Sequence, residues 1–79
     1  MAREVIFEGS SLTISVIDNR LIAFRLSNDK HLFETYPLSQ LAEGMSIEEA
    51  KHKLKREANS IMDISINNLK RILSKDSDI

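Results

Sequence analysis

Apolar and polar residues alternate in the first part of the chain in a way that is typical of β-strands. LTISVI, from Leu12 to Ile17, alternates the two kinds of residue, and a second apolar segment, LIAFRL, begins at Leu21. A period of two places alternate side chains on the two faces of a strand. The break between the segments holds Asp18-Asn19, residues that tolerate the left-handed backbone of a tight turn. The pattern predicts an antiparallel hairpin.

Two further strands are predicted on either side of this hairpin. Ahead of it, REVIFEG offers Val5 and Phe7 as apolar positions, and EGSS is expected to turn. After it, a polar break from Ser27 to Lys30 precedes a short strand from about His31 to Thr35. Short strands joined by tight turns form antiparallel sheets. We therefore expect a meander of three or four antiparallel strands.

The second half of the chain carries helical signals instead. Pro37, the chain's only proline, precedes LSQL, which predicts a short helical turn ended by Gly44. Ser46 followed by Glu49 matches a capping box, in which the hydroxyl accepts the N–H of the third helical residue and the carboxylate of that residue reaches back to the cap. Apolar residues then recur at helical spacing, at Ile47, Ala50 and Leu54. A helix over residues 47–57 is predicted.

Three interpretations are open for SIMDISINNLKRILSK, the segment from Ser60 to Lys75. It could be the tail of one long helix, a strand followed by a short helix, or the recognition helix of a DNA-binding motif. Its Asn, Ser, Asp and β-branched residues are weak helix formers, so a break is favoured. We predict an extended NSIM segment, a cap at Asp63 or Ser65, and a helix over residues 66–74. The inward residues of that helix are Leu69, Ile72 and Leu73, and residues 76–79 are expected to fray.

Length and composition indicate one small domain. The 79 residues are treated as a single α+β domain, with a three- to four-stranded antiparallel sheet followed by two short helices. The chain has no cysteine, so neither a disulfide nor a thiolate zinc site can support the fold. A core of this size supplies on the order of 3–5 kcal/mol of net stability. A homodimer or a bound partner would suit so small a core.

The charge balance and the lengths of the apolar runs indicate which partners and which cellular locations are expected. Eleven basic and twelve acidic residues give a net charge of −1, without the basic excess of a nonspecific nucleic-acid binder. No apolar run reaches the roughly 20 residues that span a membrane. The first residues, MAREVIFEG, lack the apolar segment of a signal peptide. We expect a cytoplasmic protein that does not enter the membrane.

The residues that carry chemistry do not form a catalytic pattern. His31 and His52 are the only imidazoles, whereas a metal site needs several converging ligands. The serines fall mainly in predicted turns, caps and the tail, and none lies in a G-x-S-x-G elbow. Two glycines cannot form a phosphate-binding loop. We expect no enzymatic activity, no metal and no other cofactor.

Basic residues of the two predicted helices are the candidates for nucleic-acid contact. They are Lys51, Lys53, Lys55, Arg56, Lys70 and Arg71. The simpler interpretation is a solvated helix face whose cations sit near the negative end of the helix. A helix-turn-helix joins its helices by a turn of about 3–4 residues, often with Gly. The connection here is longer and has no glycine, so DNA binding is the alternative hypothesis.

The order of these elements resembles the small bacterial domain-of-unknown-function family 2442. LTISVIDNRLIAFRLS resembles the family's hairpin, Tyr36-Pro37 its linker, SIEEA its helix opening, and MDISINNL its D-I-S-V segment. Asn19 stands where that family usually has Gly, Arg25 replaces a usual Pro, and the aromatic segment before D-I-S is absent. The resemblance implies a small α+β fold without known enzymatic activity. Some relatives look like halves of toxin–antitoxin-type gene pairs or are joined to DNA-binding domains.

The leading functional hypothesis is a non-catalytic protein-interaction module. A small sheet with one or two short helices covers only one face well and leaves its edges open. Such a domain would bind and modulate one partner protein, as an antitoxin or another small inhibitor does. A small DNA-binding transcriptional regulator that uses the six basic residues is the alternative.

Overall fold

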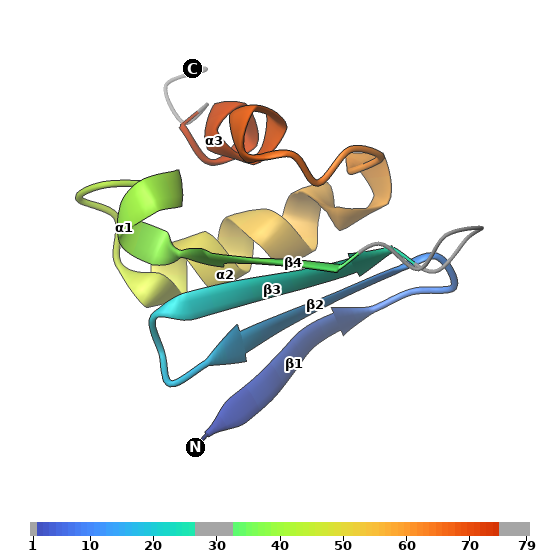
Figure 1. Ribbon diagram of the computed structural model, residues 1–79, viewed down its shortest axis with the longest axis horizontal. Helices are drawn as coiled ribbons and strands as arrows, with labels where there is room; N and C mark the ends of the chain where they lie inside the picture. The colour runs from blue at the N-terminus through green and yellow to red at the C-terminus, as the bar shows by residue number, and fades with distance from the viewer. Residues whose placement is uncertain (1, 27–32, 75–79) are drawn as a thin grey trace.

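The computed structural model describes residues 2–26 and 33–74, which form an antiparallel sheet and a set of helices (Figure 1). The strands lie side by side in chain order as β1 (Arg3–Glu8), β2 (Leu12–Ile17), β3 (Leu21–Leu26) and β4 (Phe33–Pro37). The helices are α1 (Leu38–Leu41), α2 (Ile47–Glu57), the 3-10 helix η1 (Ala58–Ser60) and α3 (Ile66–Leu73). The predicted α+β fold, a four-stranded meander followed by short helices, is confirmed.

The β2–β3 hairpin turns at the residues that the sequence indicated. Asp18 and Asn19 have φ values of 56° and 58°, the left-handed conformation that Asn and Asp tolerate better than most residues. The Arg20 N–H donates to the Ile17 carbonyl oxygen at 3.2 Å and closes the turn. The Asp18 carboxylate accepts the N–H of Ala2 at 3.0 Å, which ties the start of β1 to the same turn.

A β-bulge interrupts the alternation of β1. Val5 pairs with Ser15 and Phe7 pairs with Ile14, so Ile6 is an extra residue between the two pairs. The bulge turns Ile6 into the core at 8% exposure and leaves Val5 51% exposed. The sequence indicated Val5 and Phe7 as the apolar positions of this strand. Phe7 does contact the core, but Ile6 takes the buried position and Val5 lies on the other face of the sheet.

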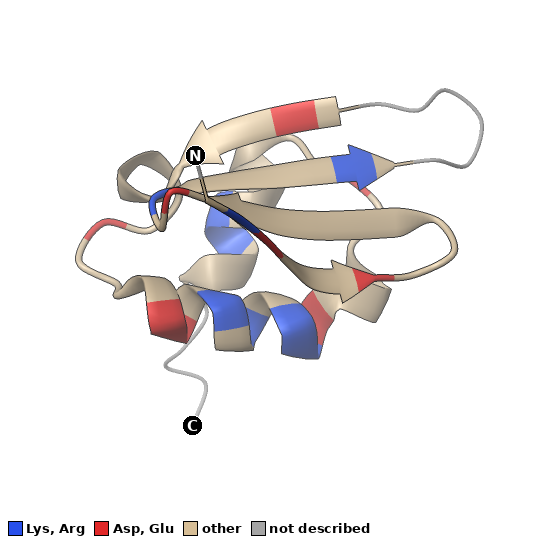
Figure 2. Cartoon of the chain, turned by 90° about the horizontal axis from the view of Figure 1, so that it is seen from below, with Lys and Arg blue, Asp and Glu red and all other residues tan. Residues whose placement is uncertain are grey.

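The hydrophobic core lies between one face of the sheet and the helices. Helix α2 packs across that face, and α3 packs against α1 and α2 (Figures 1 and 2). The largest fully buried apolar side chains are Ile14, Val16, Ile22, Phe24, Leu54, Leu69 and Leu73. The predicted inward positions Leu69 and Leu73 are thus confirmed, and Ile72 is partly buried against the same core.

Helix α2 has the predicted bounds, and of the predicted capping box the structure shows the Ser46 hydrogen bond. The Ser46 hydroxyl accepts the N–H of Glu49 at 3.1 Å, so the side chain satisfies a backbone donor that has no partner within the helix. The short helical turn after Pro37 is also present as α1, and Gly44 follows it with a φ of 87°.

The chain breaks between α2 and α3 as predicted. The 3-10 helix η1 occupies the first part of the expected extended segment, and non-helical backbone follows from Ile61 to Ile64. The Asp63 carboxylate accepts the Ser65 N–H at 2.9 Å, and the Ser65 hydroxyl accepts the Asn68 N–H at 3.4 Å. Both candidate capping residues therefore contribute. Ser65 is the N-cap, and α3 ends one residue before the predicted limit of 74.

Some sequence predictions fall on residues outside the described ranges. They are the polar break from Ser27 to Lys30, the residue His31 and the tail 76–79. Strand β4 is described from Phe33 and continues to Pro37, two residues beyond the predicted end at Thr35.

Candidate protein-interaction surface

One face of the sheet carries no helix among the described residues. The pairs Val16–Ile22 and Ile14–Phe24 point toward the helices and are buried. The residues between them point to the opposite face of the sheet, in front of which no described helix lies in Figure 2. We call this surface the open face. Its three cross-strand rows are Arg3–Ile17–Leu21–Pro37, Val5–Ser15–Ala23–Thr35 and Glu8–Thr13–Arg25–Phe33.

Large apolar side chains remain accessible on the open face. Phe33 is 55% exposed and Val5 is 51% exposed. Ile17 and Leu21 are half-buried, and Pro37 is exposed. The accessible part of the Phe33 side chain alone is on the order of 100 Å². Apolar side chains grouped with charged residues at their margin are typical of a surface that contacts another molecule.

The middle of the open face is formed by small residues, and its ends carry charge. Ser15 and Ala23 are almost fully buried, although no helix of the described residues covers this face. The Arg3 guanidinium donates to the Ser15 hydroxyl at 3.5 Å. Within the described residues, neither Arg3, Glu8 nor Arg25 forms an ion pair. These three charges are therefore available to a binding partner.

The two edges of the sheet are poorer docking sites than the open face. The β1 edge is bent by the bulge at Ile6 and carries Arg3, Glu4 and Glu8. The β4 edge ends in Pro37, which has no N–H to donate. Bulges, charged side chains and proline are the features that discourage one sheet edge from pairing with another.

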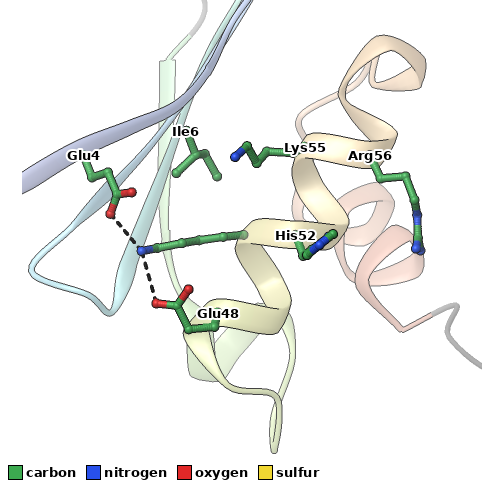
Figure 3. Close-up of a pocket in the computed structure, with 7 residues that line it drawn as sticks. Glu4, Ile6, Glu48, His52, Lys55 and Arg56 are labelled. Atoms are coloured by element: carbon green, nitrogen blue, oxygen red, sulfur yellow. Dashed lines mark hydrogen bonds and ion pairs between the residues drawn. The ribbon is translucent and has the colours of Figure 1, made fainter.

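Two of the six basic residues proposed for nucleic-acid contact are used inside the fold. The Lys51 ammonium lies 2.8 Å from the Glu4 carboxylate and 3.4 Å from that of Glu48 (Figure 3). The hydrogen bond to Glu4 is the main reason that the pKa of Lys51 is raised above its ordinary value. The Lys53 ammonium donates to the Leu73 carbonyl oxygen at 3.1 Å. Lys51 thus reaches toward β1 and Lys53 toward α3, on different sides of α2.

The other four basic residues do not complete a continuous positive surface. Arg56 lies 3.8 Å from the Glu57 carboxylate, and Arg71 donates to the Asn68 side-chain oxygen. Lys55 and Lys70 are exposed on different helices. Blue and red residues are mixed along α2 in Figure 2, so acidic side chains lie among the basic ones. The structure brings Lys51, Lys55 and Arg56 to one groove, and Lys53, Lys70 and Arg71 do not line that groove.

A shallow groove between β1 and α2 is the main depression near these basic residues. It has a volume of about 440 Å³ and is lined by Glu4, Ile6, Glu48, Lys51, His52, Lys55 and Arg56. Lys51 forms ion pairs with Glu4 and Glu48, which both line this groove and are labelled in Figure 3, so much of its charge is neutralised in place. His52 is exposed here, and His31 lies outside the described residues. No three His, Cys, Asp or Glu side chains of residues 2–26 and 33–74 gather as they would around a metal ion.

Tyr36 joins the sheet to the C-terminal helix, a role that the sequence did not indicate. Its hydroxyl donates to the Ile64 carbonyl oxygen at 3.0 Å, and its ring lies 6.4 Å from that of Phe24. Burial raises the pKa of Tyr36, and the carboxylates of Glu34 and Asp63 raise it further. The contact positions the segment before α3 on the helix side of the sheet, and it leaves the open face unobstructed.

Comparison with known proteins identifies no relative of this chain. No family model, curated protein or solved structure shows significant similarity to it. The resemblance to domain-of-unknown-function family 2442 therefore stays a prediction. Within the described part of the chain, no helix is both long enough and apolar enough to cross a membrane.

Proposed function

We propose that the protein is a non-catalytic interaction module that binds a partner protein through the open face of its sheet. The observation that carries the proposal is the exposure of Phe33 and Val5 on a sheet face that no described helix covers. Full burial of such a side chain contributes about 1.5–3 kcal/mol, so covering the exposed halves of both also contributes about 1.5–3 kcal/mol. That gain favours association with another apolar surface.

The expected mode of action is the binding and modulation of one partner, as an antitoxin or another small inhibitor does. The near-neutral charge, the absence of a catalytic sequence motif and the resemblance to family 2442 all support this choice over an enzyme. Specificity would come from the charged margin of the open face, because charges at an interface margin mainly select partners and orientation.

DNA binding through Lys51, Lys53, Lys55, Arg56, Lys70 and Arg71 is the alternative function. The intramolecular contacts of Lys51 and Lys53 argue against it, because a phosphate would have to compete with Glu4 or with the end of α3. Nonspecific DNA binding depends on many free cations and weakens steeply with salt.

Two measurements test the proposal. In a co-purification from cells, wild-type chain and Met62→Lys should retain the same partner, whereas Val5→Lys and Phe33→Lys should lose it. Met62 is a matched control, because it is an apolar residue that is 84% exposed and lies outside the open face. An electrophoretic titration with duplex DNA at two salt concentrations tests the alternative. Tight and strongly salt-dependent DNA binding would contradict the proposed function.

A further inference from the structure

We propose that the open face binds the open face of a second copy of this chain, in one defined orientation. The inference rests on the proposed function, because it takes the open face to be the interaction surface. The two-fold axis would run across the strands, along the middle row formed by Val5, Ser15, Ala23 and Thr35. Each copy would then place its first row over the third row of the other copy.

The charges at the ends of β1 are self-complementary under this rotation. Arg3 and Glu8 lie at opposite ends of the strand, roughly 15 Å apart along it, so they cannot pair within one copy. The two-fold axis brings Arg3 of each copy to Glu8 of the other copy. Because the two copies use the same surface, the contact between Arg3 and Glu8 forms twice, and the dimer gains two intermolecular ion pairs. Neither side chain has an ion-pair partner among the described residues to give up.

The apolar residues are matched by the same rotation. Phe33 in the third row would lie over the Pro37 of the second copy, and Val5 would lie near its own counterpart. Leu21 would pack along the aliphatic part of the second copy's Arg25 side chain, whose charged end can stay in water. The exposed apolar area of the open face is therefore covered, and no charge is forced into the centre.

A two-fold axis parallel to the strands fits less well than the axis across them. It would place Glu8 over the Phe33 of the second copy and Arg3 over its Pro37. Each charge would then lose water and gain no partner, which is unfavourable. The distribution of charge on the open face thus selects the axis that runs across the strands.

The size of the open face limits the strength of the contact. The molecule has extents of 34 × 31 × 18 Å, and Figure 1, which looks down the shortest axis, shows the helices stacked above the sheet, so the open face is one of the narrower sides of the molecule. Four strands of about six residues cover roughly 19 × 17 Å, and side chains at the margins widen this area. Two such faces bury on the order of 1,000 Å² together, at the lower limit of specific interfaces. A concentration-dependent dimer with micromolar or weaker affinity is expected from an interface of this size.

Sedimentation equilibrium of charge-reversal variants at low ionic strength tests the proposal. The wild-type chain should shift from a mass of 9.0 kDa to twice that mass as its concentration rises. Arg3→Glu and Glu8→Arg should each raise the dissociation constant at least tenfold, because each replaces two attractions with two repulsions. An equimolar mixture of the two variants should dimerise again, because both ion pairs of the mixed dimer are then between opposite charges. Glu43→Arg, an exposed charge reversal outside the open face, should dimerise like the wild type.

Each outcome decides the proposal. Retained dimerisation of both single reversals, or failure of their mixture to dimerise, would overturn the proposed orientation. A wild-type chain that stays monomeric at all concentrations would overturn the proposal altogether. If such a monomer still retains a different protein through Val5 and Phe33, the proposed function stands and only the second copy as partner is refuted. If Val5→Lys and Phe33→Lys still dimerise and still retain the other protein, the proposed function fails as well. Circular dichroism of each variant confirms folding, which the exposure of Arg3 and Glu8 leads us to expect.

Discussion

Tyr36→Phe isolates the hydrogen bond that ties β4 to the segment before α3. The phenol donates to the Ile64 carbonyl oxygen at 3.0 Å, and its ring packs beside Phe24. The substitution keeps the ring and removes only the hydroxyl. A net contribution of about 0.5–1.5 kcal/mol is usual for such a bond, and the site is only partly buried, so we expect a loss of about 1 kcal/mol. In a domain of this size that loss lowers the melting temperature by about 4–8 °C.

The same bond gives a pH signature. The pKa of Tyr36 lies above its ordinary value of 10.0, first because of burial and then because of Glu34 and Asp63. A raised pKa means that the folded state holds the proton more tightly, so this stability is fully present below pH 10 and is lost as pH rises through the folded-state pKa. The difference in free energy of unfolding between wild type and Tyr36→Phe should therefore be constant below pH 9 and shrink above pH 10. The raised pKa of Lys51 also weakens both proteins at alkaline pH, but it cancels in the difference.

Urea unfolding followed by circular dichroism between pH 6 and pH 11 measures this difference. Thr35→Val, at the neighbouring strand position, is the matched control, because it removes a hydroxyl that faces the open side of the sheet. The control should show the pH dependence of the wild type. The reasoning is refuted if Tyr36→Phe is as stable as the wild type at pH 7, or if its deficit persists unchanged above the alkaline transition.

Three further predictions concern the core, the helix caps and the turn. Leu69→Ala, at a fully buried position, should lower the free energy of unfolding in urea by about 2–5 kcal/mol. Met62→Ala, at an 84% exposed position, should change it by less than about 0.5 kcal/mol, and equal losses would contradict the assigned core. Ser46→Ala and Ser65→Ala should each cost about 1 kcal/mol, whereas Gly at either position should cost only a few tenths. Asn19 has a φ of 58°, which Gly adopts freely and Ala does not. In thermal unfolding, Asn19→Gly should therefore be at least as stable as the wild type, whereas Asn19→Ala should lose about 1 kcal/mol. An unchanged melting temperature for Asn19→Ala would contradict the assigned turn.

Features that depend on local backbone chemistry could be predicted from the sequence. Asp18-Asn19 marked the hairpin because few other residues tolerate two successive positive φ values. Ser46 marked the start of α2 because a hydroxyl there satisfies an unpaired N–H. The break before α3 followed from weak helix formers around Asp63. Each of these signals lies within a few residues of the feature that it predicts.

Features that depend on distant partners could not be predicted. The bulge at Ile6 arises from the register of β1 against β2, and it exchanges the faces that simple alternation assigns to Val5 and Ile6. Periodicity likewise does not show which face of β4 the helices cover, so the exposure of Phe33 was not foreseen. Lys51 looked like a surface cation because its partner Glu4 lies on a different element, 47 residues away in the sequence. The open face is a property of the assembled sheet and has no local sequence signature.

The most direct test of the open-face dimer is site-specific cross-linking at Thr35. Because the chain contains no cysteine, Thr35→Cys introduces a single thiol on the middle row of the open face. Facing sheets lie about 10 Å apart, so a bismaleimide of about that length can join two thiols that meet at the two-fold axis. Packing of two open faces about this axis predicts a cross-linked dimer for Thr35→Cys and none for Glu43→Cys. No cross-linked dimer for Thr35→Cys, or a cross-link that forms only between Val5→Cys and Thr35→Cys chains, would contradict it.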